Sequence, residues 1–354
     1  MLHESRNMTY RDNMLLTDGL RALRRRLPAG WGVGEPQAAP PPIDALVELS
    51  TANRRTGSIA VEARATLDPK GVQPLVERAR CAQAELPLVV LSRYLSGATR
   101  ERLRSREVGY LDLTGNAWLV VPEPGLFIET QGASEDPDRK ERPARSLRGP
   151  KAGRIIRALI DRRQPPGVRE LAVATKTDAS YVSRVLAFLD SEALVTRVGH
   201  GRLESVDWPA LMRRWAQEAP LESRGKTRMF LEPRGLTGLV GRLAESEEHY
   251  AITSSLAAAT FAPVAPARLV VIWVRDAAQA AARLALRPTE TGANVLLVEP
   301  ADESVFEGAT QRDGVWYAAP SQVAADLLTS PGRGPAEGEE LINWMRANED
   351  AWRQ

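Results

Sequence analysis

The segment from Lys151 to Trp208 constrains the fold of this chain more than any other stretch, because its pattern specifies five short elements in a fixed order. A basic helix over residues 151–163 comes first, with apolar residues four apart on one face, and Pro165 and Pro166 end it. A short helix over residues 168–174 and a polar turn then precede a third helix. The apolar residues of that third helix fall at i, i+3, i+4 and i+7, namely Val182, Val185, Leu186 and Leu189.

Two β-like runs follow the helices, over residues 195–198 and 203–206, joined by Gly199-His200-Gly201-Arg202. The glycines favour a hairpin with a basic tip. Two helices, a turn, a third helix and a basic hairpin are the order of a winged helix-turn-helix. Three short helices and a hairpin also occur in protein-interaction modules, so this alternative stays open.

A winged helix that binds duplex DNA places its third helix in the major groove. Ser180, Ser183 and Arg184 would then lie nearest the base edges, and Tyr181 and Lys176 would lie at phosphates. Arg202 and His200 would bring the hairpin into the minor groove. The full predicted DNA-binding set is Lys151, Arg154, Lys176, Thr177, Ser180, Tyr181, Ser183, Arg184, Arg197, His200 and Arg202.

The distribution of charge supports this interpretation, although the whole chain has a net charge of only +2. Residues 139–163 contain ten Lys or Arg residues and two acids, Glu141 and Asp161. Such a cluster leading into the first helix is expected of a protein that contacts phosphates. A solvated basic linker is the alternative.

The cysteine, histidine and apolar content of the sequence argues against disulfide-bonded, metal-binding and membrane-spanning proteins. A single cysteine, Cys81, excludes internal disulfides and a cysteine-based zinc site, as expected in a reducing cytoplasm. The three histidines lie far apart, which argues against a histidine metal cluster. No apolar run approaches the roughly 18–20 residues that span a membrane, and the N-terminus lacks a signal-peptide pattern. We therefore expect a cytoplasmic, nucleoid-associated protein.

The remaining sequence predicts α/β domains on both sides of this segment, because strand-like and helix-like runs alternate. We expect domains at residues 1–133, 151–220 and 221–354, with a basic, proline-containing linker over residues 134–150. The fold class is therefore multi-domain α/β with a central winged helix-turn-helix.

The first domain resembles the PD-(D/E)XK restriction-endonuclease-like fold. Pro42-Ile43-Asp44 followed by Val61-Glu62-Ala63-Arg64 matches its Asp on one strand and Glu-x-Lys on the next. In that family the two carboxylates hold Mg²⁺ and the lysine positions the attacking water. Here Arg64 replaces the lysine, and a guanidinium stays protonated with a wider donor fork. The resemblance implies a nuclease-like fold that has lost cleavage, in which Asp112 and Asn116 of a later run are structural.

The second half resembles the AbiEi-like antitoxin regulators of type IV toxin–antitoxin systems. The matching runs are residues 250–255, 292–297, 313–316 and 322–337. The resemblance implies a C-terminal domain with a nucleotidyltransferase-like fold. An active member needs a Gly-Ser step and two aspartates on the next strand. Here Ser254-Ser255 occupies the step and residues 269–274 carry no Asp, so nucleotide transfer is not expected. Gly332-Arg333-Gly334 could cradle a phosphate or form an ordinary loop.

Together these features predict a sequence-specific, non-enzymatic transcriptional regulator, a repressor or antitoxin-like protein that binds double-stranded DNA as a homodimer. The family resemblance adds a cognate toxin protein as an expected partner. No cofactor is expected, and Mg²⁺ belongs only to the alternative of a DNA nuclease with Asp44, Glu62 and Arg64 as working residues. A second alternative is a non-catalytic protein that binds DNA ends.

Overall fold

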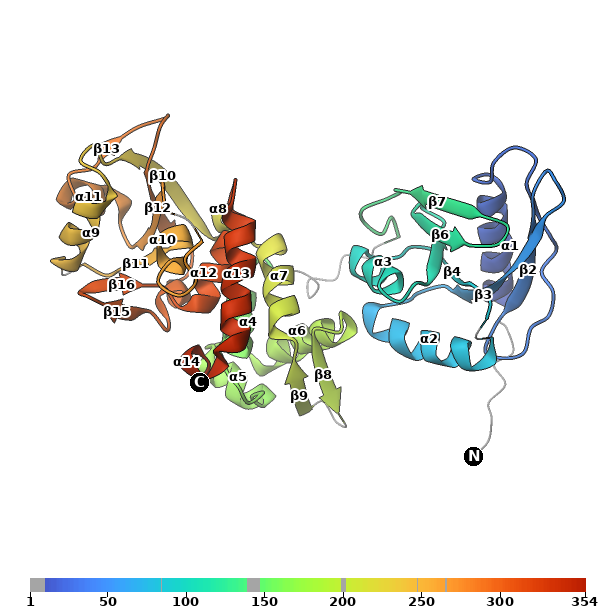
Figure 1. Ribbon diagram of the computed structural model, residues 1–354. Coiled ribbons are helices and arrows are strands. Elements are labelled where there is room, and N and C mark those ends of the chain that lie inside the picture. The colour runs from blue at the N-terminus through green and yellow to red at the C-terminus, as the bar shows by residue number, and fades with distance from the viewer. Residues whose placement is uncertain (1–9, 84, 139–146, 199–201, 247, 265) are drawn as a thin grey trace. The chain divides into compact units, whose positions relative to one another are not determined.

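The protein is a mixed α/β chain, described by a computed structural model over residues 10–83, 85–138, 147–198, 202–246, 248–264 and 266–354 (Figure 1). Strands of this part of the chain form two seven-stranded sheets and one two-stranded hairpin. The chain divides into two compact units, Met1–Arg142 with Ser191–Ala193, and Pro143–Asp190 with Leu194–Gln354. We call them the N-terminal and the C-terminal unit.

The sheet of the N-terminal unit follows chain order, β1-β2-β3-β4-β5-β6-β7. The pairs β3–β4 and β4–β5 are parallel, and the other pairs are antiparallel. Its strands are β1 (Gly32–Val33), β2 (Ala45–Ser50), β3 (Thr56–Arg64), β4 (Leu88–Ser92), β5 (Gly109–Asp112), β6 (Ala117–Val121) and β7 (Leu126–Thr130). The strand-like runs of the sequence, at residues 31–35, 43–49, 58–65, 86–91, 109–113, 117–121 and 125–130, predict each strand within three residues of its observed ends.

Helices cover both faces of this curled sheet. Helix α1 (Tyr10–Arg24) buries its leucines against one face, and α2 (Pro69–Ala82) and α3 (Gly97–Arg104) cover the other (Figure 1). The curl brings the β6–β7 turn against β3. A Cβ atom on Gly57 would lie 2.0 Å from the Glu123 carbonyl oxygen, so only glycine fits at this approach.

The C-terminal unit begins with the elements predicted between residues 151 and 219. They are α4 (Pro150–Asp161), α5 (Val168–Ala174), α6 (Ala179–Ser191), the hairpin strands β8 (Val195–Val198) and β9 (Arg202–Val206), and α7 (Trp208–Glu218). We call this stretch the helix–hairpin segment. The predicted apolar stripe of α6 is buried, together with the apolar face of α4.

The second sheet has the strand order β13-β10-β14-β12-β11-β16-β15. Its strands are β10 (Gly225–Leu231), β11 (Tyr250–Thr253), β12 (Val270–Val274), β13 (Arg287–Pro288), β14 (Val295–Pro300), β15 (Thr310–Arg312) and β16 (Val315–Tyr317). The remaining helices are α8 (Leu221–Arg224), α9 (Leu236–Ala244), α10 (Ser254–Ala258), α11 (Ala277–Arg283), α12 (Pro320–Leu327), α13 (Gly334–Ala347) and α14 (Glu349–Trp352), with a short 3₁₀ helix at Glu303–Phe306. Strands β12, β14 and β16 were predicted. Strand β10 was not, because four consecutive residues of it are exposed and show no alternation.

The helix–hairpin segment and the second sheet share one unit and one continuous apolar core. The sequence predicts separate domains with a boundary at residues 220 and 221. Helix α12 contacts both α4 and α7, and α13 lies beside them (Figure 1). The ion pair between Arg213 of α7 and Glu339 of α13, at 2.6 Å, joins the two parts at the surface.

None of the helices in the described part of the chain is both long and apolar enough to cross a membrane.

Candidate nucleic-acid interface

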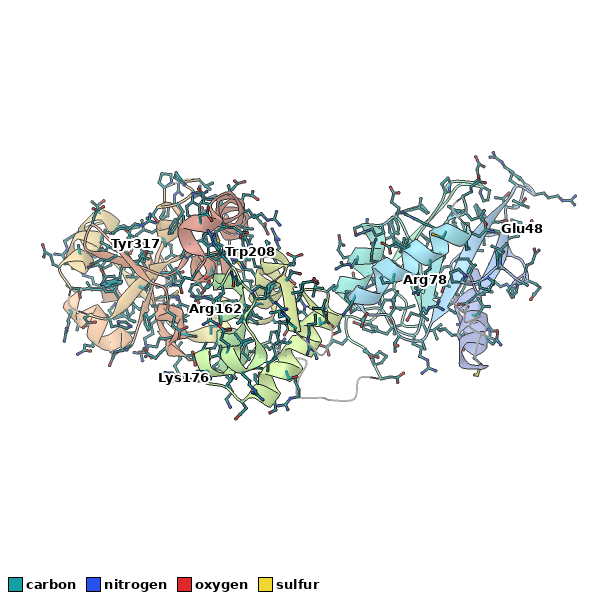
Figure 2. The ribbon with its side chains drawn as sticks, turned by 90° about the horizontal axis from the view of Figure 1, so that it is seen from below. Glu48, Arg78, Arg162, Lys176, Trp208 and Tyr317 are labelled. Atoms are coloured by element: carbon teal, nitrogen blue, oxygen red, sulfur yellow. The ribbon has the colours of Figure 1, made fainter. Side chains whose placement is uncertain are left out.

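The turn between α5 and α6 is fixed by local hydrogen bonds. Lys176 has a φ of +50°, in the left-handed region, so the chain reverses within one residue. The amide N–H of Thr177 donates to the carbonyl oxygen of Ala172 at 3.0 Å, and the Thr175 hydroxyl donates to the carbonyl oxygen of Leu171 at 2.7 Å. The predicted Thr177 therefore serves the turn, whereas the Lys176 side chain is exposed at the outer edge of the segment (Figure 2).

Helix α6 has one buried and one exposed face. Ser180, Arg184 and Ala187 are exposed at i, i+4 and i+7, and form one stripe along the helix. Ser183 and Tyr181 are half-buried beside it. The structure therefore places two of the predicted base-contacting residues, Ser180 and Arg184, on the same face. Ala187 was missed, although the helical spacing from Ser180 would have found it.

Arg184 packs against Tyr181 on this helix. Its guanidinium carbon lies 5.8 Å from the centre of the Tyr181 ring, within the range of a cation–π contact. Burial raises the pKa of the Tyr181 hydroxyl, and the positive charge of Arg184 opposes that shift. Tyr181 therefore stays neutral and can donate a hydrogen bond, while Arg184 is held at the exposed stripe.

The hairpin contributes one exposed cation among its described residues, Arg202 of β9. Arg197 of β8 is half-buried and already takes part in an interaction. His200 and the rest of the hairpin tip lie outside the described residues.

Only part of the predicted basic cluster of residues 139–163 is available on the surface. Lys151 is exposed, but Arg157 is 2% exposed. Arg162 and Arg163 pair with Glu170 and Asp350. Residues 139–146 lie outside the described chain. Cations that are close together in the sequence are thus exposed, buried or paired with acids in the fold.

Arg154, a member of the predicted DNA-binding set, makes contacts inside the protein. Its Nη1 donates to the carbonyl oxygen of Thr175 at 2.9 Å, at the end of α5, and its Nε lies 3.4 Å from Asp302 Oδ2. The side chain therefore connects α4 to α5 and to the second sheet. Arg169, which the sequence reasoning left out, is exposed on α5. Lys151, Arg169, Lys176 and Arg202 form no ion pair with any described residue.

The predicted nuclease residues do come together in the N-terminal unit. Asp44 precedes β2, and Glu62 and Arg64 lie on β3. Arg64 Nη1 donates to Asp44 Oδ2 at 3.1 Å, Arg64 Nη2 forms an ion pair with Glu62, and the Ala63 amide N–H donates to Asp44 Oδ2 at 2.8 Å. The guanidinium therefore lies against both carboxylates.

This donor set does not fit Mg²⁺. Magnesium requires oxygen ligands in near-octahedral order, but both carboxylates are paired with a cation that cannot be deprotonated. Among the described residues, no three His, Cys, Asp or Glu side chains are arranged to hold a metal ion. We derive no cleavage step for this site.

Asp112 and Asn116 form a hydrogen-bonded turn after β5. Asp112 Oδ1 accepts from the amides of Thr114 and Asn116 at 3.0 and 3.1 Å, and Oδ2 accepts from the Leu95 amide at 3.0 Å. Asn116 Oδ1 accepts from Arg100 Nη1 at 2.6 Å. Both side chains are fully buried, as expected for residues that hold a turn.

Ser254 and Ser255, which the family resemblance aligns with the Gly-Ser step, lie directly after β11 of the second sheet, and the next strand lacks the two aspartates of an active member. Ser254 follows β11 with a φ of +62°, and β12 consists of five buried residues, none of them acidic. The next aspartate along the chain, Asp276, accepts a hydrogen bond from the Gln279 amide at 2.9 Å and caps α11. Arg333, in the predicted phosphate loop, lies 3.7 Å from Glu337.

Comparisons with protein-family models, with curated proteins and with solved structures find no match for this chain.

Proposed function

We propose that the helix–hairpin segment is a winged helix-turn-helix and that the protein is a sequence-specific regulator of transcription that binds double-stranded DNA. The observation that carries the proposal is the α6 stripe of Ser180, Arg184 and Ala187, next to the turn that presents Lys176. Short and small side chains permit close approach to base edges, and arginine binds guanine through its donor fork.

The surrounding cations support the proposal. Four of them, Lys151, Arg169, Lys176 and Arg202, are exposed and lack an ion pair within the described chain. Cations that are already paired inside the protein lose that pairing when they bind a phosphate, whereas these four lose only water and counterions. They are therefore the side chains best suited to phosphate contacts.

Several finer expectations belong to the same proposal. The N-terminal unit is proposed as a degenerate restriction-endonuclease-like fold and the second sheet as a degenerate nucleotidyltransferase-like fold. We propose a homodimer on an inverted repeat, because a two-fold protein matches a two-fold operator. A cognate toxin rests on the family resemblance alone, and the nucleoid as location follows from the proposed DNA binding.

Two alternatives define the test. A nuclease would need a metal where Arg64 lies against Asp44 and Glu62, so this interpretation is disfavoured. A protein that grips DNA ends would bind without sequence preference.

A gel-shift assay with duplex DNA from the upstream region of the gene separates these interpretations. It includes an excess of random duplex, and lanes with and without Mg²⁺. We expect a shift that survives the competitor and leaves the DNA intact. Shortened DNA in the Mg²⁺ lanes would identify a nuclease, and equal binding to all duplexes or a preference for ends would identify an end-binding protein.

A further inference from the structure

A line of buried polar side chains crosses the C-terminal unit from the second sheet to α4. It starts at Asp326 of α12, which is fully buried. Asp326 Oδ2 accepts hydrogen bonds from Thr253 Oγ1 at 2.6 Å and from Trp273 Nε1 at 3.0 Å. Asp326 Oδ1 accepts from Gln322 Nε2 at 2.8 Å. One carboxylate therefore joins β11 and β12 to α12.

Gln322 continues this line to the helix–hairpin segment. Its Oε1 accepts a hydrogen bond from Arg157 Nη1 of α4 at 2.6 Å. The other nitrogens of Arg157 donate to the carbonyl oxygen of Glu307 at 3.0 Å and to Asp161 Oδ2 at 3.2 Å. The guanidinium is thus held from three sides inside the protein.

The amide of Gln322 makes this connection directional. Its donor is used by Asp326 of the same helix and its acceptor by Arg157, so a displacement of α4 relative to α12 breaks the bond to Arg157. A buried charged group that loses its partner is costly. Helices α4 and α12 are therefore expected to move together.

The position of α4 in turn determines the position of the proposed DNA-contacting turn. The buried face of α4 shares its core with α5 and α6. Arg154 of α4 donates to the carbonyl oxygen of Thr175, one residue before Lys176. A shift of α4 would thus be passed to the turn and to α6.

The far end of the line lies beside a strained turn. Thr253 is the last residue of β11, and the next residue, Ser254, has a φ of +62° at the start of α10. Non-glycine residues rarely adopt this conformation, and it persists only where surrounding contacts hold it. The hydroxyl of Thr253 on Asp326 is one such contact.

We infer that Gln322 is a positioning residue for DNA binding, which couples the β11–α10 turn to the orientation of α6. The second sheet then regulates the proposed DNA-binding site, because a change at this turn reaches α4 through buried hydrogen bonds. This inference rests on the proposed function for its consequence, DNA affinity, but the mechanical coupling itself can be measured without DNA.

The test compares two full-length variants that both remove hydrogen bonds to Asp326. Gln322→Leu breaks the line between the β11–α10 turn and α4, whereas Trp273→Phe removes a bond to the same carboxylate and leaves Thr253, Gln322 and Arg157 with their hydrogen bonds. Binding to a fluorescein-labelled duplex of the upstream region is measured by anisotropy, well below both melting temperatures. We expect Gln322→Leu to weaken binding between about twofold and thirtyfold, and Trp273→Phe to leave it unchanged.

Amide hydrogen exchange of the free variants distinguishes failure of the inference from failure of the proposed function. Gln322→Leu should speed exchange in α5 and α6, and Trp273→Phe should not. If the wild type binds no DNA, the proposed function fails, and the exchange result alone still decides the coupling. Equal effects of the two variants on α5 and α6, or none from Gln322→Leu, would overturn it.

Should Gln322→Leu fail to fold, Arg157→Lys provides the milder variant, because lysine keeps the charge but lacks the planar donor fork. It is expected to act in the same direction on exchange in α5 and α6. Exchange rates in the Arg157→Lys variant that match those of the wild type would also overturn the inference.

Discussion

Lys176→Ala and Arg154→Ala form a matched pair that separates a phosphate contact from an internal one. Both remove a cation that the sequence placed in the DNA-binding set. Lys176 is exposed without an ion pair to any described residue, whereas Arg154 bonds Thr175 and lies 3.4 Å from Asp302. The two substitutions should therefore act on different quantities, the salt dependence of DNA binding and the free energy of unfolding.

The magnitudes follow from the exposed cations of the helix–hairpin segment that form no ion pair with a described residue and are proposed to contact phosphates. These are Lys151, Arg169, Lys176 and Arg202. If each neutralises one phosphate, log K against log salt has a slope of about −3.6 for each bound protomer. Lys176→Ala should reduce this slope to about −2.7.

Arg154→Ala should leave the slope unchanged and destabilise the fold. The carbonyl oxygen of Thr175 loses a charged donor and Asp302 loses its ion-pair partner, for a loss of about 1–2 kcal/mol. Anisotropy titrations over a salt series give the slopes, and urea unfolding gives the stabilities. An equal drop in slope for both variants would refute the assignment of Arg154, because that residue would then reach phosphate in the complex. A wild-type slope much steeper than about −3.6 per protomer would mean that cations other than these four take part.

The remaining predictions concern one base contact and two buried carboxylates. Arg184→Ala should cost about 1–3 kcal/mol on the preferred duplex and less on random duplex; equal losses in competition titrations would make Arg184 a phosphate contact instead. Asp326→Ala should destabilise the C-terminal unit by roughly 3–5 kcal/mol in urea unfolding, because Arg224 keeps its buried charge without its partner at 2.8 Å; a loss below about 1 kcal/mol would show that water reaches this site. Burial alone would raise the pKa of Glu232, but the hydrogen bond from the backbone N–H of Arg234 and the charge of Arg242 hold it below its ordinary value. Its contribution to stability is therefore present above the unfolded pKa of about 4.3 and lost as the pH falls through the folded pKa. Glu232→Gln should flatten that part of the acid-unfolding curve, and an unchanged curve would contradict the assignment.

Local periodicity predicted most elements of the chain, because amphipathic helices and buried strands carry their burial pattern in adjacent residues. The stripe of α6 is an example, since Val182, Val185, Leu186 and Leu189 are all buried as their spacing indicates. Strand β10 carries no such pattern, because residues 226–229 are all exposed. Its place in the sheet depends on pairing with β13 and β14, which lie far along the chain.

The sequence predicted which residues of the candidate site are exposed only where neighbouring residues determine that exposure. Ser180, Arg184 and Lys176 are exposed where the helical pattern placed them. In the sequence, Arg154 and Arg157 are two arginines of one basic run and have the same apparent access to phosphate. In the structure, Arg154 donates to the carbonyl oxygen of Thr175, and Arg157 donates to Gln322, 165 residues away in the chain. Partners at such separations have no periodicity to reveal them, so a basic run in sequence overstates the basic surface of the folded protein.

Selection of duplexes from a random pool tests the central claim most directly, because it asks whether α6 contacts bases in a sequence-dependent way. The wild-type protein and Arg184→Ala are each used to enrich duplexes through several rounds. We expect the wild type to enrich one motif, and the variant to lose the preference for a guanine within that motif while keeping the rest. Enrichment of no motif by the folded wild-type protein, or of the same motif at full strength by the variant, would contradict the claim that Arg184 on α6 determines sequence recognition.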